Sequence, residues 1–220
     1  NEYSLEMLLS KKAWYSKPEA FNDPFDCHLN FDENIPVDKY EKCLRWQLKR
    51  EGRTELQIEK DLKLLISPDG KVNDDAKRVI DEISASTLDV INNMGVLCLT
   101  ERNDSVTMWA HYADNHKGVC VGFLVSNETV PIKVSYVPEA PRVNFSNLFD
   151  DESDEDGYKW IFSKHHEWKD EKEWRMVVSQ GNQLWPIPGK IHHVIFGLRM
   201  NDGKRDIIKR ILENGHEVQY

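Results

Sequence analysis

Two glutamates and an arginine, Glu171, Glu173 and Arg175, alternate along the chain near its last third. On an extended backbone, alternate residues lie on one side of a strand, so these three side chains would share one side. Trp174 and Met176 would then face the other way, into the core. Such a set is either a salt-bridge ladder, with Glu173 and Arg175 as a structural ion pair at a sheet edge, or a site in which two carboxylates act together.

An aromatic segment at residues 108–114 offers a surface for a flat ligand. Trp109 and Tyr112 are three residues apart and therefore lie on one face of a helix. This spacing is typical of plain aromatic packing. It also allows Tyr112 to be a stacking platform for a ligand ring, with His111 as a hydrogen-bonding neighbour.

A third segment, residues 21–27, is dense in turn residues. Asn22 and Asp23 precede Pro24, an order that can close an Asx-type turn. The turn is either purely structural or presents Asn22 and Asp23 to a bound cofactor. The density of polar, aromatic and turn residues in all three segments favours a site over ordinary scaffold.

The elements that must position these segments are of two kinds. Residues 38–94 show the apolar spacing of helices, and strands predominate after them. The predicted strands are 12–16, 96–100, 118–125, 130–137, 174–179, 193–196 and 216–220, and the further predicted helices are 1–10, 105–113, 158–168 and 206–212. Early helices and late strands favour an α+β fold. We expect a single domain over 1–220, with 38–94 as a helical insert or subdomain.

Composition narrows the classes of partner. The 220 residues contain 29 Lys and Arg against 38 Asp and Glu, a net charge of −9, which argues against indiscriminate nucleic-acid binding but leaves a local basic groove open. The acidic run at 150–156 is expected to be a solvated loop. The longest apolar stretch, 119–125, is far shorter than the roughly 20 residues of a membrane span, so no membrane segment is expected. No signal peptide is evident, and the scattered cysteines indicate a reducing cytoplasm.

Standard catalytic and metal-binding motifs are missing. The sequence has no GxxxxGK[ST], GxGxxG, GxSxG or HExxH pattern. The adjacent histidines at 165–166 and 192–193 would diverge on a strand or a helix and so would not share a metal ion. No metal site is therefore predicted.

Four motifs together resemble a bacterial family known as domain of unknown function 2971. They are FNDPFDC at 21–27, MWAHYAD at 108–114, GVCVGF at 118–123 and WKDEKEWR at 168–175. They span most of the chain in the order typical of that family. The family name implies no activity.

The order of elements also resembles, more weakly, that of ADP-ribosyltransferases, which grip NAD in a split sheet. In this likeness, 95–100 is the second strand, 105–112 the helix after it and 118–123 the next strand. Tyr112 falls where the stacking tyrosine belongs, and Glu173 falls where the catalytic glutamate belongs. Glu171 completes an E-x-E pattern. The resemblance implies a split mixed or antiparallel sheet, with NAD as substrate.

The chemistry of NAD cleavage suits these residues. Loss of nicotinamide leaves an oxocarbenium-like ribose, whose positive charge Glu173 would stabilise while holding the 2′-hydroxyl. Glu171 would orient or deprotonate the acceptor. Trp109, His111, Asn22 and Asp23 would line the NAD site, and Arg175 would reach the pyrophosphate or pair with Glu173.

We therefore expect an NAD-dependent ADP-ribosyltransferase, acting on a protein or nucleic acid as a bacterial toxin or anti-phage defence effector. One alternative is a non-catalytic sensor that binds a nucleotide or a protein through the aromatic cleft. Another is a metal-dependent hydrolase or nuclease that would use Asp23, Asp26, Glu171, Glu173 and His111.

Overall fold

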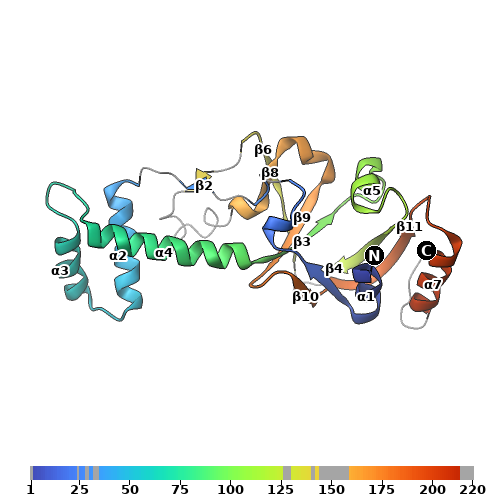
Figure 1. The fold of residues 1–220 in the computed structure, drawn as a ribbon, viewed down its shortest axis with the longest axis horizontal. Coiled ribbons are helices and arrows are strands. Elements are labelled where there is room, and N and C mark those ends of the chain that lie inside the picture. The colour runs from blue at the N-terminus through green and yellow to red at the C-terminus, as the bar shows by residue number, and fades with distance from the viewer. Residues whose placement is uncertain are drawn as a thin grey trace.

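The computed structural model describes residues 2–23, 25–27, 30–31, 35–125, 130–139, 142–143 and 159–213. Its helices are α1 (Glu2–Ser10), α2 (Val37–Arg50), α3 (Glu55–Leu65), α4 (Asp74–Asn93), α5 (Val106–Tyr112) and α7 (Asp202–Glu213), with 3-10 helices η1 (Pro18–Ala20), η3 (Lys159–Phe162) and η4 (His166–Glu171). Its strands are β1 (Lys12–Tyr15), β2 (Asn30–Phe31), β3 (Gly95–Thr100), β4 (Val119–Val125), β5 (Ile132–Lys133), β6 (Ser135–Val137), β7 (Arg142–Val143), β8 (Ser163–His165), β9 (Glu173–Val178), β10 (Gln183–Pro186) and β11 (Gly189–Phe196). The expected α+β class is confirmed (Figure 1).

The strands form several small sheets, most of them antiparallel. β9 lies between β3 and β5 in one sheet, β4 pairs with β11, and β1 pairs with β10. Two short pairs, β2 with β7 and β6 with β8, are parallel. The register places Thr100 opposite Glu173 and Cys98 opposite Arg175, so these side chains share one face. Because β9 is the central strand, the expectation that Glu173 and Arg175 pair at a sheet edge was wrong.

Helices α2, α3 and α4 pack on one another and extend away from α5 and β4 (Figure 1). The helices predicted within 38–94 are confirmed, and their role as an insert or subdomain stays a prediction. Asn73 caps α4 by accepting from the backbone of Ala76, and Thr54 and Gln57 form a capping box on α3. The apolar stripes of the three helices meet in their own core, made of Cys43, Leu44, Ile58, Leu62, Ala76 and Ile80.

Two further cores hold the rest together. Near the end of α4, Ile91 packs with Val96 of β3 and with Trp160 and Ile161 of η3, which joins the helical arm to the sheets. A separate core lies where α1 and α7 cover β4 and β11, and its buried members are Leu8, Ile191, Val194, Met200, Ile208 and Leu212. The cavity described below lies between these two cores.

The helix predicted at 158–168 was wrong over the residues that are described. Two 3-10 turns, η3 and η4, flank β8 there, and β8 pairs in parallel with β6. Strand pairing and burial of Lys164 outweigh the local helical pattern, as tertiary contacts commonly do. The acidic run at 150–156 and the strand predicted at 216–220 lie outside the described residues.

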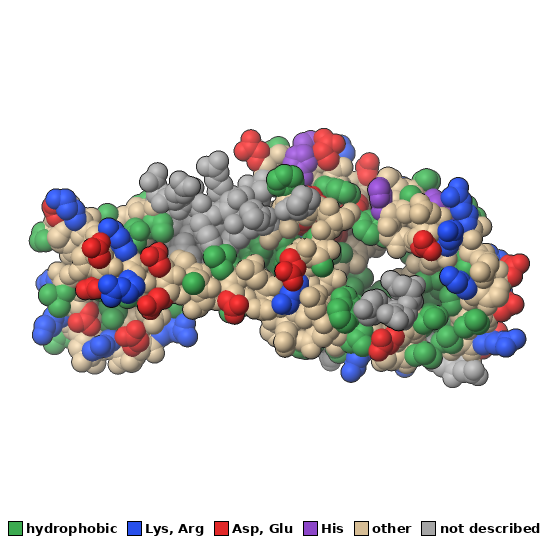
Figure 2. Space-filling view, viewed as in Figure 1, with side chains coloured by type: hydrophobic (Ala, Val, Ile, Leu, Met, Phe, Trp, Pro, Cys, Tyr) green, Lys and Arg blue, Asp and Glu red, His purple; other side chains and the backbone are tan. Residues whose placement is uncertain are grey.

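The surface of the helical arm mixes acidic and basic side chains, as Figure 2 shows. Arg45, for example, contacts Glu41, Glu55 and Glu59 at the surface. Within the ranges given above, no helix has the length and apolar character needed to span a bilayer. The four cysteines are free thiols. A cytoplasmic location stays a prediction.

Candidate active site beside a buried charge cluster

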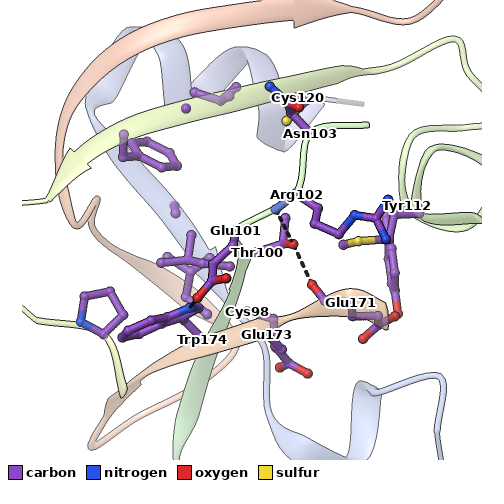
Figure 3. Close-up of a pocket in the computed structure, with 18 of the residues that line it drawn as sticks. Cys98, Thr100, Glu101, Arg102, Asn103, Tyr112, Cys120, Glu171, Glu173 and Trp174 are labelled. Atoms are coloured by element: carbon purple, nitrogen blue, oxygen red, sulfur yellow. Dashed lines mark hydrogen bonds between the residues drawn. The ribbon is translucent and has the colours of Figure 1, made fainter. Parts of the chain in front are cut away.

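A cavity of about 1040 Å³ lies between β3 and β4, with α5 at one side (Figure 3). Its wall includes 96–100 of β3 and 119–123 of β4. The aromatic lining residues are Trp14, Phe21, Trp109, Tyr112, Phe123 and Trp174, and the charged ones are Asp26, Glu101, Arg102, Lys164, Glu171 and Glu173. A largely apolar wall that includes aromatic rings and a few charged groups is typical of small-molecule sites.

A kink between η4 and β9 brings Glu171 and Glu173 together. Lys172 between them is left-handed, with φ of 46°, so Glu171 ends a 3-10 helix and Glu173 begins a strand. The hydroxyl of Thr100 donates to the Glu171 carbonyl at 2.6 Å, and the Glu173 amide donates to the Tyr136 hydroxyl oxygen at 2.8 Å. These bonds fix the kink from both sides, so the two carboxylates converge although Glu171 is not on the strand.

Arg175 is fully buried, and each of its guanidinium nitrogens is bonded. Nε donates to Glu173 Oε1 at 2.7 Å, while Nη2 donates to both carboxylate oxygens of Asp26 at 2.7 and 2.8 Å. Nη1 donates to the Ile161 carbonyl at 2.6 Å and to Cys27 Sγ at 3.0 Å. Buried charges are tolerated when paired and hydrogen-bonded in this way.

Lys164 is the second buried cation. Its ammonium donates to Glu171 Oε2 at 2.6 Å and to Glu173 Oε2 at 3.0 Å, and it lies 3.5 Å from Asp26 Oδ2. It also lies 4.9 Å from the ring centroid of Trp168. Only 5% of the Lys164 side chain is exposed. One ammonium group therefore holds three carboxylates in place.

Tyr112 connects the charge cluster to the cavity mouth. Its hydroxyl donates to Glu171 Oε1 at 2.8 Å and accepts from Asn22 Nδ2 at 3.3 Å. The residue is half exposed, at 52%. The ring of Tyr112 is therefore held by its hydroxyl while part of it stays open to a ligand.

The cluster is electrostatically asymmetric. Burial alone would raise the pKa of Glu173, but hydrogen bonds and charge from Arg175, together with Lys164, hold that pKa below its usual value. Burial raises the pKa of Asp26, and the two cations offset only part of the rise. Burial and the bond to Glu171 raise the pKa of Tyr112 to about 12, so its hydroxyl stays a donor at neutral pH.

The structure brings some of the expected site residues together and leaves others apart. Asn22, Tyr112, Glu171, Glu173 and Arg175 form one connected network. His111 is exposed and is not among the lining residues of the cavity; its ring centroid lies 6.3 Å from that of Tyr112.

Trp109 and Asp23 have structural contacts of their own. Trp109 lines the cavity, stacks on His116 and donates from Nε1 to the Asn103 carbonyl at 2.8 Å. Asp23 is buried and closes the predicted Asx-type turn by accepting from the Phe25 amide at 2.9 Å.

The expectation that Trp174 faces the core was wrong. Trp174 is half-buried, lines the cavity and donates from Nε1 to Glu101 Oε1 at 2.8 Å. Met176, on the same face of β9, lies against buried Tyr15, whose hydroxyl is 3.6 Å from the Met176 sulfur. Trp174 and Met176 therefore share one face of β9, but Trp174 borders the cavity whereas Met176 packs in the interior.

Asp26 and Lys164 are central to the cluster but were not predicted as binding or catalytic residues of an NAD site. Asp26 belongs to the turn-rich segment at 21–27, whose residue types had already indicated part of a site. Lys164 lay in a predicted helix. Its role follows from the pairing of β8 with β6, which the local sequence does not reveal.

The carboxylates of this cluster are paired with side-chain cations. In the ranges that are described, no group of three or more His, Cys, Asp or Glu residues is arranged to hold a metal ion. The Lys164 ammonium occupies the point where Asp26, Glu171 and Glu173 converge. Binding of a divalent cation there would require displacement of that ammonium.

Fold and site together define an α+β protein with a buried charge cluster at the wall of an aromatic-lined cavity. Residues 108–176 match the model of a family described as protein of unknown function (DUF2971), which confirms the resemblance seen in the motifs. The matched segment contains Tyr112, Lys164, Glu171, Glu173 and Arg175. No curated protein and no solved structure matches the chain.

Proposed function

We propose that this protein is an ADP-ribosyltransferase that consumes NAD. The observation behind the proposal is the convergence of Glu171 and Glu173 with the Tyr112 hydroxyl at the wall of a large aromatic-lined cavity. The order β3, α5, β4, β9 and the separate sheets of β3 and β4 on either side of the cavity agree with a split, ADP-ribosyltransferase-like sheet. Neither feature alone specifies the reaction.

The proposed reaction breaks the bond between ribose C1′ and the nicotinamide nitrogen. The bonding electron pair leaves with nicotinamide, and positive charge develops on the ribose. Glu173 would stabilise that charge, because Arg175 and Lys164 keep its pKa low and its carboxylate ionised. A nucleophile of the acceptor then forms the new bond to C1′ and gives its proton to Glu171, which acts as general base.

Glu173 has few free positions for a substrate hydroxyl. Its carboxylate accepts from Arg175 through both oxygens and from Lys164 through Oε2. A carboxylate offers about four lone-pair positions. Three of these positions are taken, which leaves one on Oε1, and the ribose 2′-hydroxyl would donate there.

The exposed part of Tyr112 would stack on the nicotinamide ring. Trp109 and Asn22 also line the cavity and would bound this subsite. His111 and Asp23 are not among the lining residues, so we assign them no contact with NAD.

A second candidate function is a nucleotide-binding sensor without catalysis. The supporting observation is the near-complete burial of Glu173, whose side chain is 4% exposed and already paired with two cations. In this alternative the cluster is a structural unit under a binding cavity. It predicts that NAD binds without release of nicotinamide.

The acceptor would be a macromolecule, and the protein would act as a bacterial toxin or as an effector in defence against phage. The helical arm of α2, α3 and α4 would then contact the acceptor. Its charged surface, with Arg45 amid glutamates, is suited to polar recognition.

The experiment for this proposal is incubation of the protein with NAD labelled in the adenylate part and with bacterial cell extract. Transfer of label to protein or to nucleic acid, resolved by protease and nuclease digestion, would support a transferase and identify the acceptor class. Tyr112→Ala tests the cavity, and Leu198→Ala, at an exposed residue outside the cavity lining and the helical arm, is the control. Retention of all label as intact NAD would oppose the transferase and favour the sensor.

A further inference from the structure

If the protein binds NAD, as proposed above, an Arg or Lys at the cavity wall would be a favourable partner for the diphosphate. Arg175 was one expectation for this role, and the structure excludes it in the observed arrangement. All three guanidinium nitrogens of Arg175 are bonded to Asp26, Glu173, Cys27 and Ile161, and the side chain is buried completely. Arg175 therefore has the other role expected for it, as the ion-pair partner of Glu173.

The other buried cation is also committed. Lys164 is shared among three carboxylates. With Asp26, Glu171 and Glu173 ionised, the cluster that includes Arg175 has one more negative than positive group. Such a cluster attracts the positively charged pyridinium of NAD and repels its diphosphate.

Among the lining residues that the structure describes, Arg102 is the remaining Arg or Lys. Its backbone amide donates to Thr100 Oγ1 at 2.9 Å, and the same hydroxyl donates to the Glu171 carbonyl. The Thr100 hydroxyl therefore links the backbone of Arg102 to the backbone of Glu171, at the turn that carries both glutamates. In Figure 3 its side chain extends from the end of β3 toward Tyr112.

The Arg102 guanidinium is hydrogen-bonded through Nε. Nε donates to Asp104 Oδ1 at 3.0 Å, and within the described part of the chain no hydrogen bond is found for Nη1 or Nη2. The Arg102 side chain is 33% exposed, so these two nitrogens have access to a ligand. A guanidinium oriented through Nε presents its other N–H groups for bidentate contact with phosphate oxygens.

We infer that Arg102 binds the diphosphate of NAD and thereby sets the direction of the dinucleotide in the cavity. The nicotinamide riboside lies toward Tyr112 and Glu173, where the negative cluster faces it, and the diphosphate lies at Arg102. Asp104 is a positioning residue that orients the guanidinium. Because an uncharged nucleoside has no diphosphate to contact Arg102, the site would select dinucleotides over uncharged nucleosides.

The test compares Arg102→Gln with Arg210→Gln, an exposed arginine of α7 that lies outside both the cavity lining and the helical arm. Loss of charged hydrogen bonds to the diphosphate should raise KM for NAD by about 10- to 100-fold in Arg102→Gln, with kcat within about threefold of wild type. Inhibition by inorganic pyrophosphate should weaken similarly, and Arg102→Lys should restore part of it. Arg210→Gln should match wild type.

Failure of the inference is separable from failure of the proposed function. If Glu173→Gln abolishes NAD turnover while Arg102→Gln leaves KM and pyrophosphate inhibition unchanged, the Arg102 assignment is wrong and the transferase stands. If the wild type does not turn over NAD, calorimetric titration with inorganic pyrophosphate decides the assignment. Binding that Arg102→Gln removes would support an anion site, and equal binding or none would overturn it.

Discussion

Asp26 accepts two hydrogen bonds from Nη2 of Arg175, at 2.7 and 2.8 Å, across 149 residues of sequence. This pair connects the turn-rich segment at 21–27 with β9. Arg175 also donates to Glu173. The Asp26 carboxylate therefore helps to position the proposed catalytic glutamate through Arg175. Two of the three segments singled out in the sequence thus meet through a single guanidinium.

We expect Asp26→Ala to lower the free energy of unfolding by about 3–5 kcal/mol, because removal of one partner leaves a buried charge uncompensated. Asp75→Ala removes a carboxylate that is 72% exposed and paired with Arg78, and should cost at most about 1 kcal/mol. Urea denaturation followed by circular dichroism measures both values. Equal effects of the two substitutions would mean that the buried pair adds nothing to stability.

The low pKa of Glu173 predicts how stability depends on pH. Since this pKa is lower in the folded protein than the value of about 4.3 for an unfolded glutamate, the unfolded chain binds the proton more tightly at low pH. The contribution of Glu173 is thus complete above about pH 5 and is lost as pH falls through the folded pKa.

Glu173→Gln should therefore show a shallower loss of stability between about pH 5 and pH 3, by up to about 1.4 kcal/mol per pH unit. The pKa of Asp26 is raised by burial, so its contribution to the pH dependence of stability has the opposite sign to that of Glu173. Asp26 is present in both proteins. Urea denaturation at a series of pH values measures the difference. Parallel curves for the two proteins would contradict the ion-paired state of Glu173.

Tyr112 should contribute to NAD binding mainly through its ring. Tyr112→Phe keeps the stacking surface and loses the hydrogen bonds to Glu171 and Asn22, so KM for NAD should change by less than about fivefold. Tyr112→Ala loses the ring and should raise KM by about tenfold or more. Steady-state release of nicotinamide gives both constants. A larger KM effect for Phe than for Ala would remove the stacking role.

Chelation of divalent cations should leave NAD turnover unchanged. The Lys164 ammonium already occupies the point where the carboxylates of Asp26, Glu171 and Glu173 converge, so the proposed reaction needs no bound metal there. Assays with and without EDTA test this. Activity that disappears with EDTA and returns with Mg²⁺ or Mn²⁺ would instead favour the hydrolase or nuclease alternative.

Local patterns predicted much of the fold. Apolar spacing over 38–94 predicted the helices that the structure shows as α2, α3 and α4. Alternation along 171–175 indicated that Glu173 and Arg175 share a face, as they do. These features depend on neighbours within one element, which the sequence displays directly.

The remaining features depend on contacts between distant segments. Lys164 reaches the cluster because β8 pairs with β6, and the residues that flank it read locally as a helix. The sequence also gave no sign that Trp174 lines the cavity while its neighbour Arg175 is buried with Asp26. A strand shows which residues share a side, but only the packing of other elements decides which side is covered.

The role of Glu173 in NAD cleavage is measured by the release of free nicotinamide from NAD by wild type and by Glu173→Gln. We expect release by the wild type and a loss of at least about 100-fold in Glu173→Gln, since charge stabilisation in a shielded site is worth several kcal/mol. Circular dichroism must show that the variant is folded, and Glu213→Gln, at an exposed acid at the end of α7, is the control. Release at the wild-type rate by folded Glu173→Gln would contradict the account.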